Sequence, residues 1–409
     1  MTLPRIFVAI PLMDEKACIH NLLADLTAQL YPASRICVCV NQPDHWWDLP
    51  QKREICISNR EVLDLLHHVR ELPLHLIDRS GRGNGWKGRQ HGVGWSRKLA
   101  MDACAAVAGT GDIILSLDGD TRFKPGYFES VAQAFLDRKP AVALAVPYYH
   151  PLTGDETTDR AILHYEIYMR YYSLNLWRIG SPYAFTALGS AMAVRISAYR
   201  AIRGITPLLS GEDFYFLQKL RKHGEMMRWC PEKVYPAARF SDRVFFGTGP
   251  AMIKGRAGDW SSYPLYHYRL FDQVAETASR FPLLFHQSIP TPMDAFLKKI
   301  FREQDIFTPL RKNNTDEARF IRACHGKIDG LRILQYLKSE HRNGNVNDGN
   351  NLRDFLLTHY PHTEIPSQVV DAGNDLFKRS VCELDQLRNY LEGLETQHQM
   401  AHFQNLPSC

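Results

Sequence analysis

The stretch Ile113–Thr121, with the sequence IILSLDGDT, runs from a short apolar segment directly into two aspartates that are separated by one glycine. The apolar segment has the length and composition of a strand buried in a parallel sheet. Ligands of open α/β sheets bind outside the carboxyl ends of the strands, and Asp118 and Asp120 fall at such an end. This D-x-D pair can hold Mg²⁺ or Mn²⁺, because both ions prefer hard oxygen ligands. An ordinary Asp-Gly turn is the alternative.

The N-terminal sequence has the pattern of a strand, a helix and a second strand. Arg5–Pro11 (RIFVAIP) is typical of a buried strand, and apolar residues at helical spacing follow between Ile19 and Leu30. Ile36–Val40 (ICVCV) is typical of the next strand, in which Cys37 and Cys39 would be buried as small apolar side chains. This order indicates parallel pairing, so we predict an α/β fold with a mostly parallel sheet flanked by helices.

The pattern changes along the second half of the chain. Ser190–Val194 is a further short apolar run, and Gly211-Glu212-Asp213 opens a helical pattern that ends at Gly224. Beyond residue 290 the strand patterns stop and only helical patterns remain. We therefore predict three regions, which are an α/β domain over residues 1–250, a connecting or lid segment over 251–289 and a helical C-terminal region over 290–409.

The composition is that of a globular protein, with 45% hydrophobic and 23% charged residues. The net charge of +5 suits an anionic ligand but lacks the excess typical of nucleic-acid binding, so we expect no nucleic-acid partner. Nine cysteines without C-x-x-C spacing favour reduced thiols and a cytoplasmic location over a disulfide framework or a zinc site. No apolar run is long enough to span a membrane, although docking on a membrane surface stays open.

Residues 79–98 form a loop with six glycines and six Arg or Lys residues. Glycines let backbone N–H groups approach an anion, and basic side chains form charge-assisted hydrogen bonds with phosphate. The spacing is not that of a P-loop or of a dinucleotide-binding fingerprint. We expect Arg97 and Lys98, at the start of the following helix, to contact a donor molecule. A flexible surface loop is the alternative.

Ser210-Gly211-Glu212-Asp213 puts two acids at the start of a helix. There, Asp213 could accept a proton from an attacking hydroxyl group, as a general base does. The competing interpretation is a helix cap, because S-x-x-D resembles a capping box and acids favour the positive end of the helix dipole. The spacing leaves both interpretations open.

Five segments follow one another along the chain: IPLMDE, GVGWSRKLAMDA, ILSLDGDT, GSAMAVRISAYRAIRGI and SGEDFYFLQKLRKHG. Their order resembles that of the inverting glycosyltransferases of family 2, which have a GT-A fold. The resemblance covers about residues 4–250. It implies that the D-x-D acids, Asp118 and Asp120, bind the metal and the donor. It also implies that Asp213 is the base and that Arg97 lies near the donor.

Three further donor-side assignments accompany the resemblance. Glu15, the acid after the first strand, matches the family position beside the nucleobase, and Glu212 belongs to the acid pair of the later helix. After the second strand the family usually has acids, whereas this chain has Asn41-Gln42-Pro43-Asp44. Asn41 is therefore our candidate there, and the donor nucleotide stays undetermined.

The segment Glu225–Trp229 only imitates the Q-x-x-R-W motif of processive family members, and no membrane helix is expected. We therefore predict an enzyme that makes single transfers. Two further predictions concern the following residues. Ala238–Gly249 is expected to be a mobile lid over the diphosphate, with an ordinary connection as the alternative. His267 is a candidate third metal ligand, with a core or surface histidine as the alternative.

These features predict a glycosyltransferase that moves a sugar from a nucleotide-diphosphate donor to an acceptor hydroxyl with Mn²⁺ or Mg²⁺ as cofactor. The acceptor, whether a glycan, a lipid-linked sugar or a small molecule, is not determined. One alternative is a sugar-nucleotide nucleotidyltransferase, but the glycine-rich signature of that class would directly follow the first strand, where this chain reads PLMDEK. A non-catalytic module that binds nucleotide-sugars or carbohydrates is the other alternative.

Overall fold

A computed structural model describes residues 3–88, 90–239, 248–256, 259–261, 263–341, 347–366 and 376–406 of the chain. Two compact units interleave along the sequence. The first unit comprises residues 1–162, 186–259 and 399–409, and the second comprises 163–185 and 260–398. Our boundaries at residues 250 and 290 stay a prediction, while the compact units follow a different division of the chain.

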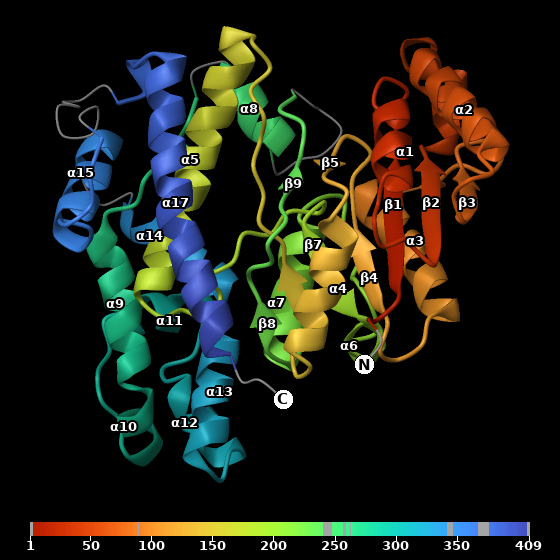
Figure 1. Cartoon of the computed structure of the whole chain (residues 1–409). Coiled ribbons are helices and arrows are strands. Elements are labelled where there is room, and N and C mark those ends of the chain that lie inside the picture. The colour runs from red at the N-terminus through yellow and green to blue at the C-terminus, as the bar shows by residue number, and fades with distance from the viewer. Residues whose placement is uncertain are drawn as a thin grey trace. The chain divides into compact units, whose positions relative to one another are not determined.

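Within the described residues, the first unit contains a seven-stranded sheet with the order β3-β2-β1-β4-β7-β6-β8 (Figure 1). Its strands are β1 (Ile6–Leu12), β2 (Arg35–Asn41), β3 (Leu74–Arg79), β4 (Ile113–Ser116), β6 (Ala143–Ala145), β7 (Met192–Arg195) and β8 (Met226–Met227). Strand β7 alone runs against its neighbours, β4 and β6, and the other pairings are parallel. The predicted mostly parallel sheet is confirmed.

Helices flank this sheet and cover its central strands. They are α1 (Ile19–Thr27), α2 (Arg53–His68), α3 (Val93–Val107), α4 (Tyr127–Asp137), α6 (Ile196–Ala201) and α7 (Glu212–His223). The first unit also contains α8 (Thr248–Arg256). Every residue of β1 is buried, which requires cover on both faces of the sheet and explains the uninterrupted apolar run. Cys37 and Cys39 are buried in β2 as free thiols, as predicted.

The end of the chain packs into the first unit. Arg138, which follows α4, donates from Nε to the carbonyl oxygen of Phe403 at 3.0 Å, and its guanidinium lies over the Phe403 ring. The indole of Trp229 lies on the same phenylalanine, with ring centroids 5.3 Å apart. Phe403 therefore contributes to the packing of the α/β unit.

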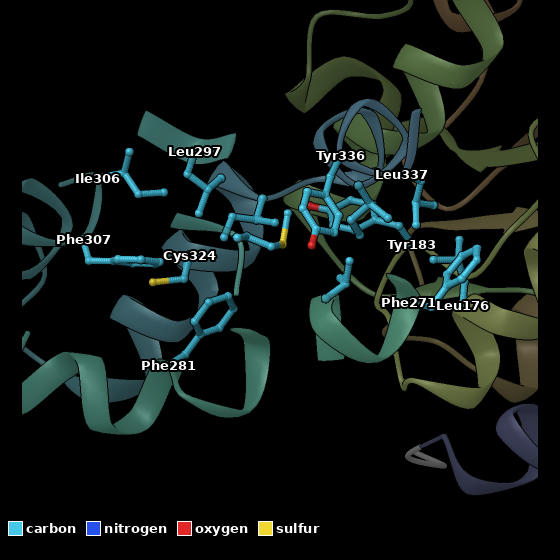
Figure 2. Packing of buried hydrophobic residues seen from close by; sticks show 14 of the residues in the cluster. Leu176, Tyr183, Phe271, Phe281, Leu297, Ile306, Phe307, Cys324, Tyr336 and Leu337 are labelled. Atoms are coloured by element: carbon cyan, nitrogen blue, oxygen red, sulfur yellow. The ribbon is translucent and has the colours of Figure 1, made fainter. Parts of the chain in front are cut away.

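In the described part of the chain, the second unit is helical and includes α5 (Glu156–Arg178) from Leu163 onward. The other helices are α9 (Tyr268–Ser279), α10 (Phe281–His286), α11 (Asp294–Phe301), α12 (Phe307–Asn313), α13 (Glu317–Lys327), α14 (Gly330–His341), α15 (Asp348–His359) and, as far as His398, α17 (Val381–Asn405). Apolar residues of α5 and of the helices from α9 to α14 meet in a core that includes Phe271, Phe281 and Leu337 (Figure 2). The predicted C-terminal helical region is confirmed. None of the helices described here combines the length and hydropathy needed to cross a bilayer.

Buried charges join α5 to α17 inside the second unit. Arg170 donates from Nε to Glu166 at 3.0 Å and from Nη1 to Glu395 at 2.8 Å. Arg388 donates to the second oxygen of Glu166 at 3.3 Å, and Ser173 Oγ donates to Glu395 at 2.6 Å. All five side chains are buried. A buried ion network is tolerated only while each charge keeps its partners, so it fixes how these two helices pair.

We expect Arg170→Met to lower the free energy of unfolding by about 3–5 kcal/mol, because it leaves Glu395 and part of Glu166 buried without a counter-charge. Urea unfolding followed by circular dichroism measures the effect. The matched control is Arg319→Met, since Arg319 pairs with Asp316 on an exposed face and such pairs contribute about 0–1 kcal/mol. Equal losses for the two variants would contradict a special role for the buried network.

Candidate active site

The guanidinium of Arg97 joins three parts of the first unit that are distant in sequence. Arg97 lies on α3 with 2% of its surface exposed. It donates from Nε to Glu212 at 3.0 Å and from Nη2 to Asp118 at 2.9 Å. Its Nη1 donates to Ser116 Oγ at 2.7 Å and to the carbonyl oxygen of Gly189 at 2.9 Å. The end of β4, the start of α7 and the turn before β7 are therefore fixed around one cation.

Gly189 has to be a glycine for Arg97 to occupy this position. A Cβ atom at residue 189 would lie 2.3 Å from Nη2 of Arg97. The same carbonyl also accepts a hydrogen bond from Ser116 Oγ at 2.7 Å. The antiparallel pairing of β4 with β7, in which Ser116 lies opposite Met192, brings this turn to the end of β4. The sequence GSAM marked this segment through the family resemblance, but its contact with Arg97 was not predicted.

The carboxylates around Arg97 change its pKa and that of Asp213. Burial alone would lower the pKa of Arg97, but Asp118, Glu212 and Asp213 raise it above the ordinary value, so the guanidinium stays charged. Burial, together with the neighbouring negative charge of Glu212, raises the pKa of Asp213 to about 7. Asp213 is half-buried and accepts a hydrogen bond from the backbone N–H of Phe214 at 2.7 Å.

The start of α7 does not have the cap that S-x-x-D suggested. Gly211, in the left-handed conformation with φ 75°, is the N-cap residue, and no side chain there forms a capping hydrogen bond. Glu212 and Asp213 occupy the first turn, where the helix dipole favours acids. Glu212 is buried and pairs with Arg97. The two acids thus differ in their surroundings, and Asp213 is the more exposed of the two.

Asp120 takes part in a second ion cluster with Glu15 and Arg239. Arg239 contacts Asp120 Oδ2 through Nε at 2.7 Å, and its Nη1 donates to Glu15 Oε2 at 3.0 Å. A two-stranded sheet brings these residues together, because β5 (Arg122–Phe123) follows Asp120 and pairs with β9 (Val234–Tyr235), which precedes Arg239. Arg239 was predicted only as part of a lid, and residues 240–247 of that lid lie outside the described residues.

Gly119, between the two aspartates, packs against the end of β1. A Cβ atom at this position would lie 2.5 Å from Leu12 Cδ2 and 2.8 Å from Glu15 Cγ. The glycine of the D-x-D motif therefore lets the motif and Glu15 pack closely. A glycine is therefore needed between the two aspartates for packing as well as for access of a ligand.

Asn41 lies at the carboxyl end of β2, close to the end of β1. Its side chain is buried, and its Nδ2 donates to the carbonyl oxygen of Leu12 at 2.9 Å. Its Oδ1 accepts a hydrogen bond from Trp86 Nε1 at 3.1 Å. Both groups of the amide are therefore bonded within the protein. A donor-binding role for Asn41 stays a prediction, and the structure gives it the task of joining these two strand ends to the glycine-rich loop.

Lys98 and His267 each have another partner in the structure. Successive residues of a helix point about 100° apart, so Lys98 points away from Arg97 and pairs with Asp102 on α3 at 2.7 Å. His267 belongs to the second unit, where its Nδ1 caps α9 by accepting a hydrogen bond from the N–H of Arg269. The donor contact of Lys98 and the metal contact of His267 therefore stay predictions. In the structure, Lys98 forms an ion pair and His267 caps a helix.

The two aspartates suit a cation that shares its coordination with a substrate. Across the described residues, no group of three His, Cys, Asp or Glu side chains is arranged to hold a metal ion. Mg²⁺ commonly uses one or two protein carboxylates together with phosphate oxygens and water. Asp118 and Asp120 provide such a pair of oxygen ligands, so they fit an ion that binds together with a diphosphate.

Comparisons with known proteins give a family match and a set of similar solved structures. Residues 113–254 match the family model described as glycosyl transferase family group 2, and this segment contains Asp118, Asp120, Glu212 and Asp213. The resemblance to family 2 glycosyltransferases is thereby confirmed over that segment, as is the prediction of an enzyme of this class. No curated protein matches the chain.

Solved structures with a similar arrangement include S. aureus TarS 1–349 in complex with UDP-GlcNAc, at 11% identity and a TM-score of 0.42, covering 83% of this chain and 92% of that one. The mannosyltransferase PcManGT from Pyrobaculum calidifontis, in complex with GDP-Man and Mn²⁺, has 13% identity and a TM-score of 0.37, with coverages of 97% and 88%. Glucosyl-3-phosphoglycerate synthase from Mycobacterium tuberculosis has 13% identity and a TM-score of 0.33, with coverages of 63% and 82%.

We expect Gly189→Ala to lower the free energy of unfolding by about 1–3 kcal/mol, because the added methyl group would force Arg97 out of its position. Urea unfolding measures the change. Gly111→Ala is the matched control, since a methyl group at residue 111 meets no atom within 4 Å. If the two variants were equally stable, the contact between Gly189 and Arg97 would not be the constraint that we describe.

Proposed function

We propose that this family 2 glycosyltransferase domain transfers a sugar from a nucleotide-diphosphate donor to an acceptor hydroxyl by a metal-dependent, inverting displacement. One observation carries the proposal. The guanidinium of Arg97 holds Asp118 of the D-x-D motif and Glu212 of the α7 acid pair on one buried cation. A metal-binding acid and a neighbour of the candidate base are thereby joined in one cluster. This arrangement supports binding of the donor and the acceptor next to each other at the Arg97 cluster.

On the donor side, we propose that Asp118 and Asp120 hold Mn²⁺ or Mg²⁺. Such an ion, when bound, neutralises the charge that develops on the departing diphosphate. Arg97 already bonds to two carboxylates, one hydroxyl and one carbonyl oxygen. We therefore propose that it acts on the donor through Asp118, whose orientation it fixes, and that Glu15 lies on the nucleobase side of the site.

On the acceptor side, we propose Asp213 as the general base. A base is most effective when its pKa is near the working pH, and the pKa of Asp213 is raised to about 7. Among the described residues, only the N–H of Phe214 donates a hydrogen bond to its carboxylate. One oxygen is thus available to an acceptor hydroxyl. The buried pair of Glu212 and Arg97 holds the helix turn that carries this carboxylate.

Several finer features of the proposal rest on the sequence. Single transfer rests on the lack of a processive motif, and the cytoplasmic location rests on the cysteine pattern. The sugar, the nucleotide and the acceptor are not determined. The rival nucleotidyltransferase would release pyrophosphate, and a binding module would release nothing from its ligand. Product analysis therefore separates the three functions.

We expect Asp213→Asn to lower the turnover number by about 10²–10⁴-fold, the range that general bases contribute. The measurement is release of nucleoside diphosphate from a panel of UDP- and GDP-sugars, with and without candidate acceptors. Donor binding in the presence of Mn²⁺ should be nearly unchanged. Asp102→Asn is the control, because Asp102 is also a carboxylate in the first unit but pairs with Lys98 and Tyr199. Undiminished transfer by Asp213→Asn would exclude the base assignment.

The raised pKa of Asp213 also predicts two pH dependences. Activity should rise as the pH passes through about 7, because the base must be ionised. Stability should change in the opposite direction. An unfolded aspartate has a pKa of about 3.9, so the folded state holds this proton more tightly and loses that contribution as the pH rises towards 7. Thermal unfolding at pH 5 and pH 8 should therefore show Asp213→Asn gaining stability relative to the wild type at the higher pH.

We expect nucleoside diphosphates to raise the thermal unfolding midpoint only together with Mn²⁺ or Mg²⁺, because a ligand that binds the folded state alone stabilises it. UDP, GDP, CDP and ADP should be compared, each with metal and with EDTA. Asp118→Asn should abolish the metal-dependent shift. An equal shift in EDTA would argue against the metal in this proposal and leave a metal-independent site.

A further inference from the structure

The contacts of Arg239 occupy the carboxylate that the proposed metal ion needs. The guanidinium pairs with Asp120 at 2.7 Å and with both oxygens of Glu15. The side chains of Asp120 and Glu15 are 13% and 6% exposed, while that of Arg239 is 31% exposed. The acids are thus shielded from water, and the arginine is the more accessible partner.

We propose that Arg239 is an internal counter-cation that competes with the divalent ion for Asp120, so that metal binding requires Arg239 to release this carboxylate. The inference rests on the proposed function, because it takes Asp120 as a metal ligand. It adds a residue whose role would be to set the affinity of the site for its ion.

Electrostatics supports competition over shared occupancy. Mg²⁺ coordinates oxygen ligands at about 2.0–2.1 Å, and Oδ2 of Asp120 already lies in contact with Nε of Arg239. The two cations would then be a few ångströms apart beside shielded carboxylates, where charges interact more strongly than in water. Although burial alone would lower its pKa, the contacts with Glu15 and Asp120 raise the pKa of Arg239 above the ordinary value. Arg239 would therefore release Asp120 by a movement of its side chain, because its guanidinium keeps its proton.

The fold allows this exchange to occur in the side chain alone. The pairing of β5 with β9 fixes the backbone on both sides of the cluster, since β5 follows Asp120 and β9 precedes Arg239. The arginine side chain is long, and about a third of it faces solvent. Its guanidinium can thus turn away while both strands stay paired.

The test is a titration of the full chain with Mn²⁺ in the absence of nucleotide, in which the electron paramagnetic resonance signal reports free Mn²⁺. We expect Arg239→Gln to bind Mn²⁺ at least about tenfold more tightly than the wild type, because a competing like charge has been removed. Arg239→Lys keeps the charge and should stay within about threefold of the wild type, well short of the change in Arg239→Gln. Arg122→Gln is the matched control, because Arg122 forms a similar two-bond pair with Asp25 next to the same small sheet. It should leave the affinity unchanged.

The outcomes separate this inference from the proposed function. The inference would be overturned if Arg239→Gln bound Mn²⁺ as weakly as the wild type or more weakly. Asp120→Asn, measured alongside, tests the function. If this variant loses Mn²⁺ binding while Arg239→Gln equals the wild type, only the inference fails. If it binds Mn²⁺ as the wild type does, the ion lies elsewhere and both proposals fail. Thermal unfolding of each variant shows that it is folded before the titration.

Discussion

The buried charge of Arg97 is the constraint on which the candidate site depends. A guanidinium in the interior is tolerated only when it is fully paired, and removing one partner leaves an uncompensated charge. Asp118 and Glu212 provide the counter-charges, while Ser116 and Gly189 accept the remaining hydrogen bonds. An arrangement of α3, β4 and α7 that separated Arg97 from these groups would leave the cation unpaired. The geometry of the candidate site therefore depends on the pairing of the buried Arg97 side chain.

The balance of charge in the two ion clusters bears on the pKa of Asp213. In the described residues around the two ion clusters, acids outnumber guanidiniums. The acids are Glu15, Asp118, Asp120, Glu212 and Asp213, and the guanidiniums are those of Arg97 and Arg239. An excess of negative charge disfavours ionisation of the acid without its own cation, and it attracts a divalent ion. Burial and this excess of negative charge together raise the pKa of Asp213, and the same excess would favour the divalent ion that we propose.

Much of the architecture could be predicted because burial leaves a pattern in the sequence. Strands β1, β2 and β4 are apolar runs of strand length, and the acids after β4 and in the first turn of α7 were identified as candidate site residues. The partners of these acids could not be read in this way. Patterns report which positions are buried, but they do not report which buried polar groups pair across large sequence separations. Arg239 next to Asp120 and Gly189 against Arg97 are two such pairs, and both depend on strand pairing.

The contact of Phe403 with Arg138 and Trp229 has a consequence for the biogenesis of the protein. Ribosomes deliver Arg138 and Trp229 long before Phe403, which covers this part of their surface. Until then, the nascent sheet would expose the indole of Trp229 to chaperones and proteases. N-terminal domains usually fold as soon as they leave the exit tunnel. Here, packing of that part of the domain waits until Phe403 has been synthesised, so a truncation before this residue would also disturb the α/β unit.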